Sequence, residues 1–404
     1  MKKFYALALI SSILFNTSCS SSDDDSSNEP TTPLSVEEGK EQLEENSIEL
    51  LNKVEAFKND DALNEIVELA EYLNSSNTSK SSGFKKVAIN SIINSAIKDG
   101  DDIVSFNAKQ SISLVSETPI ADDYENEKGT YEWNASIEDF EKTGESDDII
   151  YIINYNGKQA VFSVTDFKTT LAGDENDELP TLAKANLKID DATMFTQEYK
   201  ASLQNNSLVP SSINNTTTLG EFVFETSFSN ESNNKVIQSL SFKIGSDVIM
   251  EYNYTVNGNF NNIEDAENAE DVVDNAKFSF KFLNAELSVS AKDDGLNSDD
   301  DLTVDEQIEL LNNNIDAEIS VNNRKVADME FYKDFDTYLD WVYNNDTQDY
   351  EEVEITEEVV FARLLFDDGT TTDFDVYVDG SFTSLEDKFE SVFEAFEKLF
   401  ENVD

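Results

Sequence analysis

The sequence predicts an α+β fold: helices near the amino terminus, a large antiparallel β-meander forming a curved sheet or half-barrel, and a C-terminal amphipathic helix packed on that sheet. Apolar residues recur at helical spacing within residues 35–98 and again within residues 381–404, whereas residues 99–380 show the two-residue period of strands. Turn-forming pairs separate these strands. A hydrophobic content of 39%, with 27 Phe and 14 Tyr, is sufficient for a folded core.

The N-terminal segment, residues 35–98, is predicted to contain three amphipathic helices. Ser35 and Glu38 have the spacing of a capping box, and the Asp60-Asp61 pair suits the start of a second helix. A third helix is expected over residues 84–98. The three apolar stripes consist of Leu43, Ser47, Leu50, Leu51, Val54 and Phe57; Leu63, Ile66, Val67, Ala70 and Leu73; and Ala88, Ile89, Ile92, Ile93, Ala96 and Ile97.

Residues 99–380 read as a β-rich body with one buried face per strand. Phe222, Phe224 and Phe228 alternate with polar residues, and the same period recurs at residues 248–256 and 278–282. Hairpin turns are expected at Asn156-Gly157, Asn257-Gly258 and Asp367-Asp368-Gly369. Short helical patterns interrupt the strands at residues 263–275 and 303–314.

The last segment, residues 381–404, is predicted to be the C-terminal helix. Thr383 and Glu386 have capping-box spacing. A stripe of large apolar side chains follows on one face, comprising Leu385, Phe389, Val392, Phe393, Phe396, Leu399 and Phe400. We expect this stripe to dock against the protein's own sheet; contact with lipid or a partner protein is the alternative.

The first residues are predicted to direct export. Lys2 and Lys3 precede the short apolar stretch 4–15, and Cys19, the only cysteine of the chain, follows. Residues 1–18 resemble a bacterial lipoprotein signal peptide, and Ser22, Asp23, Asp24 and Asp25 resemble the export signal of flavobacterial surface lipoproteins. This resemblance implies acylation of Cys19 and a location on the outer membrane, facing the cell exterior. The segment 19–34 is rich in Ser, Asp, Thr and Pro, which predicts a disordered acidic tether. Acyl chains on Cys19 would anchor the protein without spanning the bilayer.

The body of the chain also resembles a type of Bacteroidota lipoprotein of unassigned function. The resemblance rests on the sequence Gly-Thr-Tyr-Glu-Trp-Asn at residues 129–134 and on Glu-Leu-Pro-Thr at residues 178–181. It implies a shared β-rich body and assigns no catalytic residue. No later segment is long and apolar enough to predict a membrane-spanning helix.

The composition excludes several classes of function. With 85 acidic and 28 basic residues the formal net charge is −57, which opposes binding to nucleic acid. The chain has no histidine, so catalytic triads and imidazole-based metal sites are excluded. No phosphate-binding or dinucleotide-binding glycine motif occurs. We therefore predict no catalytic residue and no enzymatic activity, although a carboxylate-based glycoside hydrolase needs only two suitably spaced acids.

Two groups of residues are candidates for ligand contact. Calcium is the one cofactor that the sequence suggests, at an acidic segment formed by Asp293, Asp294, Asn297, Asp299 and Asp301; a solvated loop is the simpler interpretation. A second acidic loop, with Asp174, Glu175, Asp177 and Glu178, has the same two interpretations. Trp341 with Tyr338 and Tyr343 has the aromatic density of a ligand platform, although packing in the core is the commoner role of such residues.

These observations favour a lipid-anchored cell-surface protein with a binding or structural role, which could accept an apolar ligand between its helices and its sheet. The alternative is a surface protein that binds or hydrolyses glycans, using carboxylates and an exposed Trp. A lipid or a glycan is therefore the expected ligand. The sequence identifies no protein partner.

Overall fold

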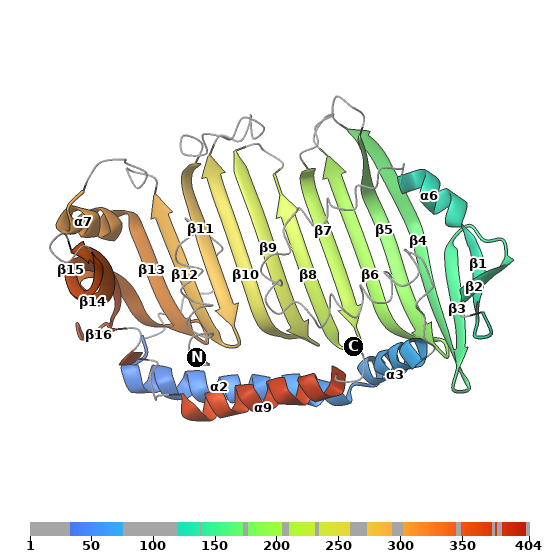
Figure 1. Ribbon diagram of the computed structural model, residues 1–404, viewed down its shortest axis with the longest axis horizontal. Helices are drawn as coiled ribbons and strands as arrows, with labels where there is room; N and C mark the ends of the chain where they lie inside the picture. Colours follow the sequence, from blue (N-terminus) through green and yellow to red (C-terminus); the bar gives the residue numbers. More distant parts are fainter. Residues whose placement is uncertain are drawn as a thin grey trace. The chain divides into compact units, whose positions relative to one another are not determined.

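The computed structural model describes residues 33–75, 120–137, 139–172, 177–203, 210–230, 234–258, 273–292, 302–344, 349–373, 376–377 and 382–400. Within these residues the helices are few (Figure 1). They are α2 (Val36–Ala56), the short 3-10 helix η1 (Phe57–Asn59), α3 (Asp61–Ser75), α6 (Ile120–Glu127), α7 (Val304–Asn314) and α9 (Thr383–Phe400).

The protein is mostly β. Its strands are β1 (Gly129–Asn134), β2 (Asp139–Gly144), β3 (Ile149–Tyr155), β4 (Lys158–Ala172), β5 (Asp177–Ile189), β6 (Ala192–Leu203), β7 (Pro210–Leu219), β8 (Phe222–Ser229), β9 (Lys235–Ile244), β10 (Asp247–Gly258), β11 (Val273–Phe282), β12 (Ala285–Lys292), β13 (Ile315–Val321), β14 (Arg324–Asn344), β15 (Asp349–Leu365) and β16 (Thr371–Asp373).

The strands follow one another in a single hydrogen-bonded order, β16 back through β3 and then β1 and β2, so the sheet is open and its end strands are β16 and β2. Neighbours from β3 to β8 and from β10 to β16 pair antiparallel, as the turn signals predict. β1 is the exception, because it pairs parallel with β3 and antiparallel with β2.

The chain divides into two compact units. One comprises residues 1–48, 232–237 and 250–387, and the other comprises residues 49–231, 238–249 and 388–404. The first unit therefore holds β11–β16 with the beginning of α2, and the second holds β1–β8 with α3 and α6.

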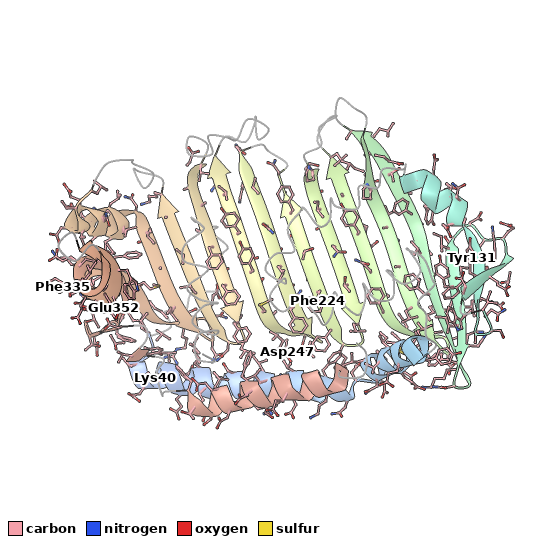
Figure 2. All side chains as sticks on the ribbon, in the orientation of Figure 1. Lys40, Tyr131, Phe224, Asp247, Phe335 and Glu352 are labelled. Atoms are coloured by element: carbon pink, nitrogen blue, oxygen red, sulfur yellow. The ribbon has the colours of Figure 1, made fainter. Side chains whose placement is uncertain are left out.

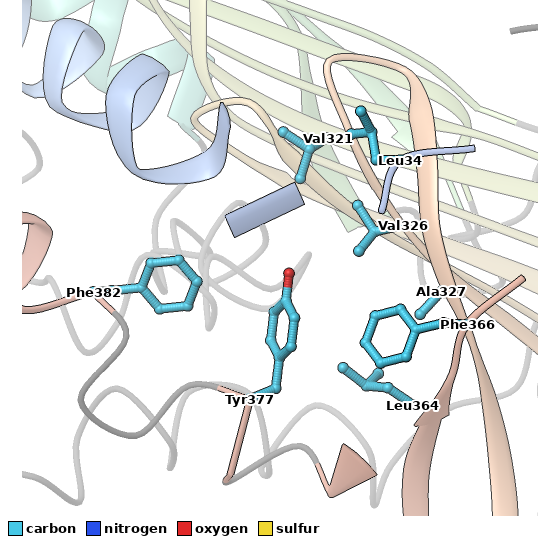
Figure 3. Close-up of a cluster of buried hydrophobic side chains, with 8 residues drawn as sticks. All are labelled: Leu34, Val321, Val326, Ala327, Leu364, Phe366, Tyr377 and Phe382. Atoms are coloured by element: carbon cyan, nitrogen blue, oxygen red, sulfur yellow. The ribbon is translucent and has the colours of Figure 1, made fainter. Parts of the chain in front are cut away.

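In the first unit, the beginning of α2 packs on hairpin turns. Buried Ser47 donates a hydrogen bond to Oδ1 of Asn284, in the β11–β12 turn, over 2.8 Å. Nδ2 of Asn284 in turn donates to the backbone oxygen of Gln42, over 3.0 Å. An apolar core lies nearby, formed by Leu34, Val321, Val326, Ala327, Leu364, Phe366, Tyr377 and Phe382 (Figure 3).

In the second unit, η1 and α3 also pack on hairpin turns. Asp60 accepts a hydrogen bond from the backbone N–H of Leu63 over 3.0 Å, which is the predicted helix cap. The Phe57 ring contacts the Phe222 ring edge-on. Nζ of Lys158, beside the β3–β4 turn, lies 2.7 Å from carboxylates of both Glu65 and Glu68 on α3, which raises the pKa of the lysine.

Most local predictions agree with the structure. The predicted capping box of Ser35 with Glu38 forms. The helical pattern expected over residues 303–314 is α7, which begins with a capping box of Thr303 with Glu306 that was not predicted from the sequence. Asn156-Gly157 makes the β3–β4 turn with positive φ at both residues, and Asp367-Asp368-Gly369 lies between β15 and β16. The third predicted helix, residues 84–98, lies outside the described residues.

Two predictions were wrong. Asn257-Gly258 is not a hairpin turn: these residues end β10 at a register irregularity, opposite Asn275 and Val273 of β11. The short helix expected over residues 263–275 does not include its last three residues, which begin β11; residues 263–272 lie outside the described residues. In both cases strand pairing overrides the local turn and helix signals.

The C-terminal helix is present as α9. Leu385 packs beside the apolar core of the first unit, and Val392 is buried. Lys388 makes an ion pair with Glu55 of α2 in the second unit. Phe389, however, is 43% exposed, so the predicted stripe is not buried along its whole length. The side chains of Phe393, Phe396, Leu399 and Phe400 lie outside the described residues.

We predict that Gly220→Ala destabilises the protein more than Gly157→Ala. Both glycines have positive φ, so an alanine strains the backbone at either position by about 1 kcal/mol. At Gly220 the added Cβ would also lie 2.8 Å from Cγ of the Asp60 cap, whereas nothing lies within 4 Å at Gly157. Urea unfolding of both variants measures the difference. Equal losses of stability would show that the Asp60 contact is unimportant.

Candidate binding surface

Strands β14 and β15 form a two-stranded ribbon, which we define as residues 334–344 and 349–359. The strands pair in continuous register from Asp328 opposite Leu365 to Asn344 opposite Asp349. Within the described part of the chain, β13 pairs with β14 only over residues 324–328, and β16 pairs with β15 only over residues 363–365. The ribbon strands therefore have only each other as strand neighbours.

Large apolar side chains of the ribbon are exposed to solvent. Phe335, Leu339 and Trp341 are 63%, 61% and 62% exposed and, at alternate positions of β14, lie on one face. Tyr338 and Val353 are also exposed, on the other face. Figure 2 labels Phe335 on this ribbon. Contiguous exposed apolar side chains of this size are typical of interaction sites.

The three exposed apolar residues on this face of β14 each lie opposite a glutamate of β15. The register pairs Phe335 with Glu358, Leu339 with Glu354, and Trp341 with Glu352, which is also labelled in Figure 2. One face of the ribbon thus carries an apolar row beside an acidic row. Because half of that face is charged, burying it against the protein's own core would leave carboxylates without solvent or partner.

Helix α7 holds the base of the ribbon at β14. The Asn312 side chain donates to the backbone oxygen of Phe331 and accepts from the Phe331 N–H, each over 2.8 Å. Lys333 pairs with Asp305 of α7 over 2.9 Å and with Glu358 of β15 over 3.4 Å, and these carboxylates raise the pKa of the lysine. The amide of Asn312 therefore takes the position that a neighbouring strand would occupy.

The other side of the base is held through β16 and Arg363. The Tyr332 hydroxyl donates to Asp373 over 2.6 Å, and this bond raises the pKa of Tyr332 to about 12. Arg363 makes a 2.8 Å ion pair with Glu330 and lies 4.7 Å from the centre of the Tyr332 ring. The ribbon therefore projects from a base fixed on both sides.

The structure separates the three predicted aromatic residues. Alternation along β14 places the Trp341 position on one face with Tyr343, and Tyr338 on the opposite face, so the three cannot form a single stacking platform. The side chain of Tyr343 lies outside the described residues. Core packing, the commoner role expected of this segment, does not describe Trp341, because its side chain is 62% exposed.

Sequence reasoning did not single out Phe335, Leu339 or the glutamates opposite them. The signal lies in the register, because the apolar alternation of β14 and the acidic alternation of β15 meet on one face only when the two strands are aligned. Trp133, the other tryptophan, packs edge-on against Phe140, next to Tyr151, in an aromatic cluster of the second unit.

The predicted calcium residues Asp293, Asp294, Asn297, Asp299 and Asp301 lie outside the described residues, as do Cys19 and Ser22, Asp23, Asp24 and Asp25. Of the second acidic loop, Glu178 accepts hydrogen bonds from the Thr169 hydroxyl over 2.6 Å and from the Ala121 N–H over 3.2 Å. The described residues contain no group of three or more Asp, Glu, His or Cys residues arranged to hold a metal ion.

The described structure defines a mostly β protein with a projecting ribbon that is apolar and acidic. None of its described helices combines the length and the apolarity that crossing a membrane requires. Comparisons with protein-family models, curated proteins and solved structures found no match to this chain.

We predict that Asn312→Ala loosens the base of the ribbon. The variant loses both side-chain bonds to the Phe331 backbone, at a cost of about 1 kcal/mol in unfolding free energy, and the Phe331 amide exchanges faster with solvent. Asn313→Ala is the matched control, because Asn313 is an exposed neighbour on the same helix. Unchanged exchange at Phe331 in Asn312→Ala would mean that Asn312 does not fix the ribbon.

Proposed function

We propose that this protein is a binding protein displayed on the outside of a bacterial cell by a lipid anchor, and that the ribbon contacts its partner. The anchor is supported by the sequence around Cys19, where a short apolar leader ends and an acidic tract begins. A binding role is supported by the exposed side chains on β14. The earlier expectation of an apolar ligand between the sheet and the helices stays a prediction.

The observation that supports the proposal best is the clustering of Phe335, Leu339 and Trp341 on one ribbon face. Burying a side chain of this size at an interface contributes about 1.5–3 kcal/mol. An aromatic or leucine anchor surrounded by charged side chains is also the usual arrangement at a protein–protein contact. The fixed base reduces the entropy lost when the ribbon binds, because its strands are already ordered.

Glycan binding is the second candidate, and exposed Trp341 favours it. A tryptophan ring stacks on sugar rings, and Glu352 lies opposite it to accept hydrogen bonds from hydroxyl groups. A glycan array probed with the protein and with Trp341→Ala separates the two candidates. Glycan signals that disappear in Trp341→Ala would show that the ribbon binds a sugar and not a protein.

We predict that a photoreactive benzoylphenylalanine at Leu339 gives a discrete cross-linked product on intact cells of the producing bacterium. Leu171 is the matched control, because it is a leucine on a strand with a similar exposure, 60%. The same residue at position 171 should give no such product. Identical products at both positions, or none at position 339, would show that the ribbon is not a contact surface.

We also predict that Cys19→Ser moves the protein from the membrane fraction to the soluble fraction, because the serine cannot be acylated through a thioether. Ser20→Ala, the neighbouring control, should remain in the membrane fraction. Protease added to intact cells should digest the wild-type protein. A membrane-bound Cys19→Ser variant would contradict the lipid anchor.

A further inference from the structure

One edge of the ribbon is open along most of its length. β15 has β14 on one side, and on the other side β16 covers only residues 363–365. Residues 349–362 therefore have no second strand neighbour within the described part of the chain. An edge strand exposes a row of backbone N–H and C=O groups, which is a template for an added strand.

The opposite edge of the ribbon is less accessible at its base. On β14, the amide of Asn312 already bonds both backbone groups of Phe331, and Asp305 pairs with Lys333. A strand that approached this edge would meet α7. The edge of β15 is therefore the better place for a partner.

The two faces of β15 differ in chemistry. Glu352, Glu354 and Glu358 project from one face, and all three are exposed. Among the residues whose side chains are described, Val353, Ile355 and Val359 lie on the other face, together with one glutamate, Glu357, and with Phe361 near the base. A strand added beside β15 would extend both faces at once, so its alternate side chains would meet mainly glutamates on one face and mainly apolar groups on the other.

A second copy of this chain does not suit that edge. If two β15 strands paired, side chains on a shared face would meet across the contact, and the Glu352, Glu354 and Glu358 row would face its own copy. The net charge of −57 adds general repulsion between copies. Charge complementarity therefore selects a basic partner.

From these contacts we propose that the partner of the ribbon is a polypeptide with an extended segment of alternating basic and apolar residues, which adds as a strand to the open edge of β15. Its basic side chains lie beside the glutamate row, and its apolar side chains lie beside Val353 and Ile355. This proposal rests on the proposed function and names the chemistry of the partner.

The test uses purified protein without its lipid anchor, residues 20–404, and a fluorescent peptide of about ten residues that alternates lysine and valine. A second peptide has the same sequence with alternate backbone nitrogens methylated, so it keeps its charge but cannot complete a strand ladder. We expect the first peptide to bind at least about tenfold more tightly than the methylated one. Its affinity should fall as salt is added. Hydrogen exchange should slow at residues 352–362.

The protein variant that tests the charge row is the triple substitution Glu352→Lys, Glu354→Lys and Glu358→Lys. It should weaken peptide binding by about tenfold or more, with an unchanged melting temperature as the check on folding. The control makes the same change in charge at exposed acids of the other unit, Glu71→Lys, Glu132→Lys and Glu221→Lys. It should reduce binding much less.

Equal binding of the methylated and unmethylated peptides would overturn strand addition and leave only non-specific charge attraction. Equal losses in the two triple variants would overturn the assignment to β15. If Leu339 cross-links on cells but the purified protein does not bind the peptide, this inference is refuted and the proposed function stands. Peptide binding at β15 without cross-linking at Leu339 would keep strand addition and overturn the proposed contact through the apolar face of β14.

Discussion

Backbone hydrogen bonding between strands that are neighbours in the sequence is the interaction on which the rest of the structure depends. The single cysteine rules out an internal disulfide, so the described part of the chain is stabilised by this pairing together with the burial of apolar side chains. Where a strand has a neighbour on each side, as β4 to β7 do, its backbone groups are satisfied by the sheet itself. Where a neighbour is missing, as along β15, those groups and the side chains around them are presented to solvent.

The helices stabilise this arrangement at the turns. In the first unit, Ser47 and Gln42 of α2 bond the Asn284 side chain in the β11–β12 turn, and in the second unit the Asp60 cap lies beside Gly220 in the β7–β8 turn. A hairpin turn is the point at which the register of two strands is set. Helices that bond to turns therefore also help to determine which side chains share a face of the sheet. Helix α7 does the same for the base of the ribbon by bonding the backbone of Phe331 in β14.

Elements with a strong local signal could be predicted from the sequence. Capping boxes, helical stripes and the Asn156-Gly157 turn depend on neighbouring residues, so the two described helices near the amino terminus and the strands at residues 222–228, 248–256 and 278–282 were expected. The conformation of Asn257-Gly258 could not be predicted from neighbouring residues, because it depends on pairing with β11, a later segment of the chain. The same limit applies to α9. How much of Phe389 is exposed depends on where this helix packs, which the helix sequence alone does not determine.

The ribbon could be predicted only in part, for a related reason. The aromatic density around Trp341 and Tyr338 indicates a candidate ligand contact, but the sequence of neither strand shows by itself that Trp341 lies opposite Glu352. Alternating apolar residues in β14 are typical of a buried face, and only the partner strand shows that the face is half charged. The composition of neither strand predicts that the apolar side chains of β14 are exposed. Only the register between β14 and β15 places them beside glutamates.

The sequential order of the strands bears on how the chain folds as it is synthesised. Because each strand from β4 onward pairs with the one just before it, no part of this region must wait for a distant segment in order to form its ladder. A polypeptide that is synthesised amino terminus first can therefore form this region one hairpin at a time. The same order lets evolution lengthen or shorten the sheet by whole hairpins without rethreading what remains.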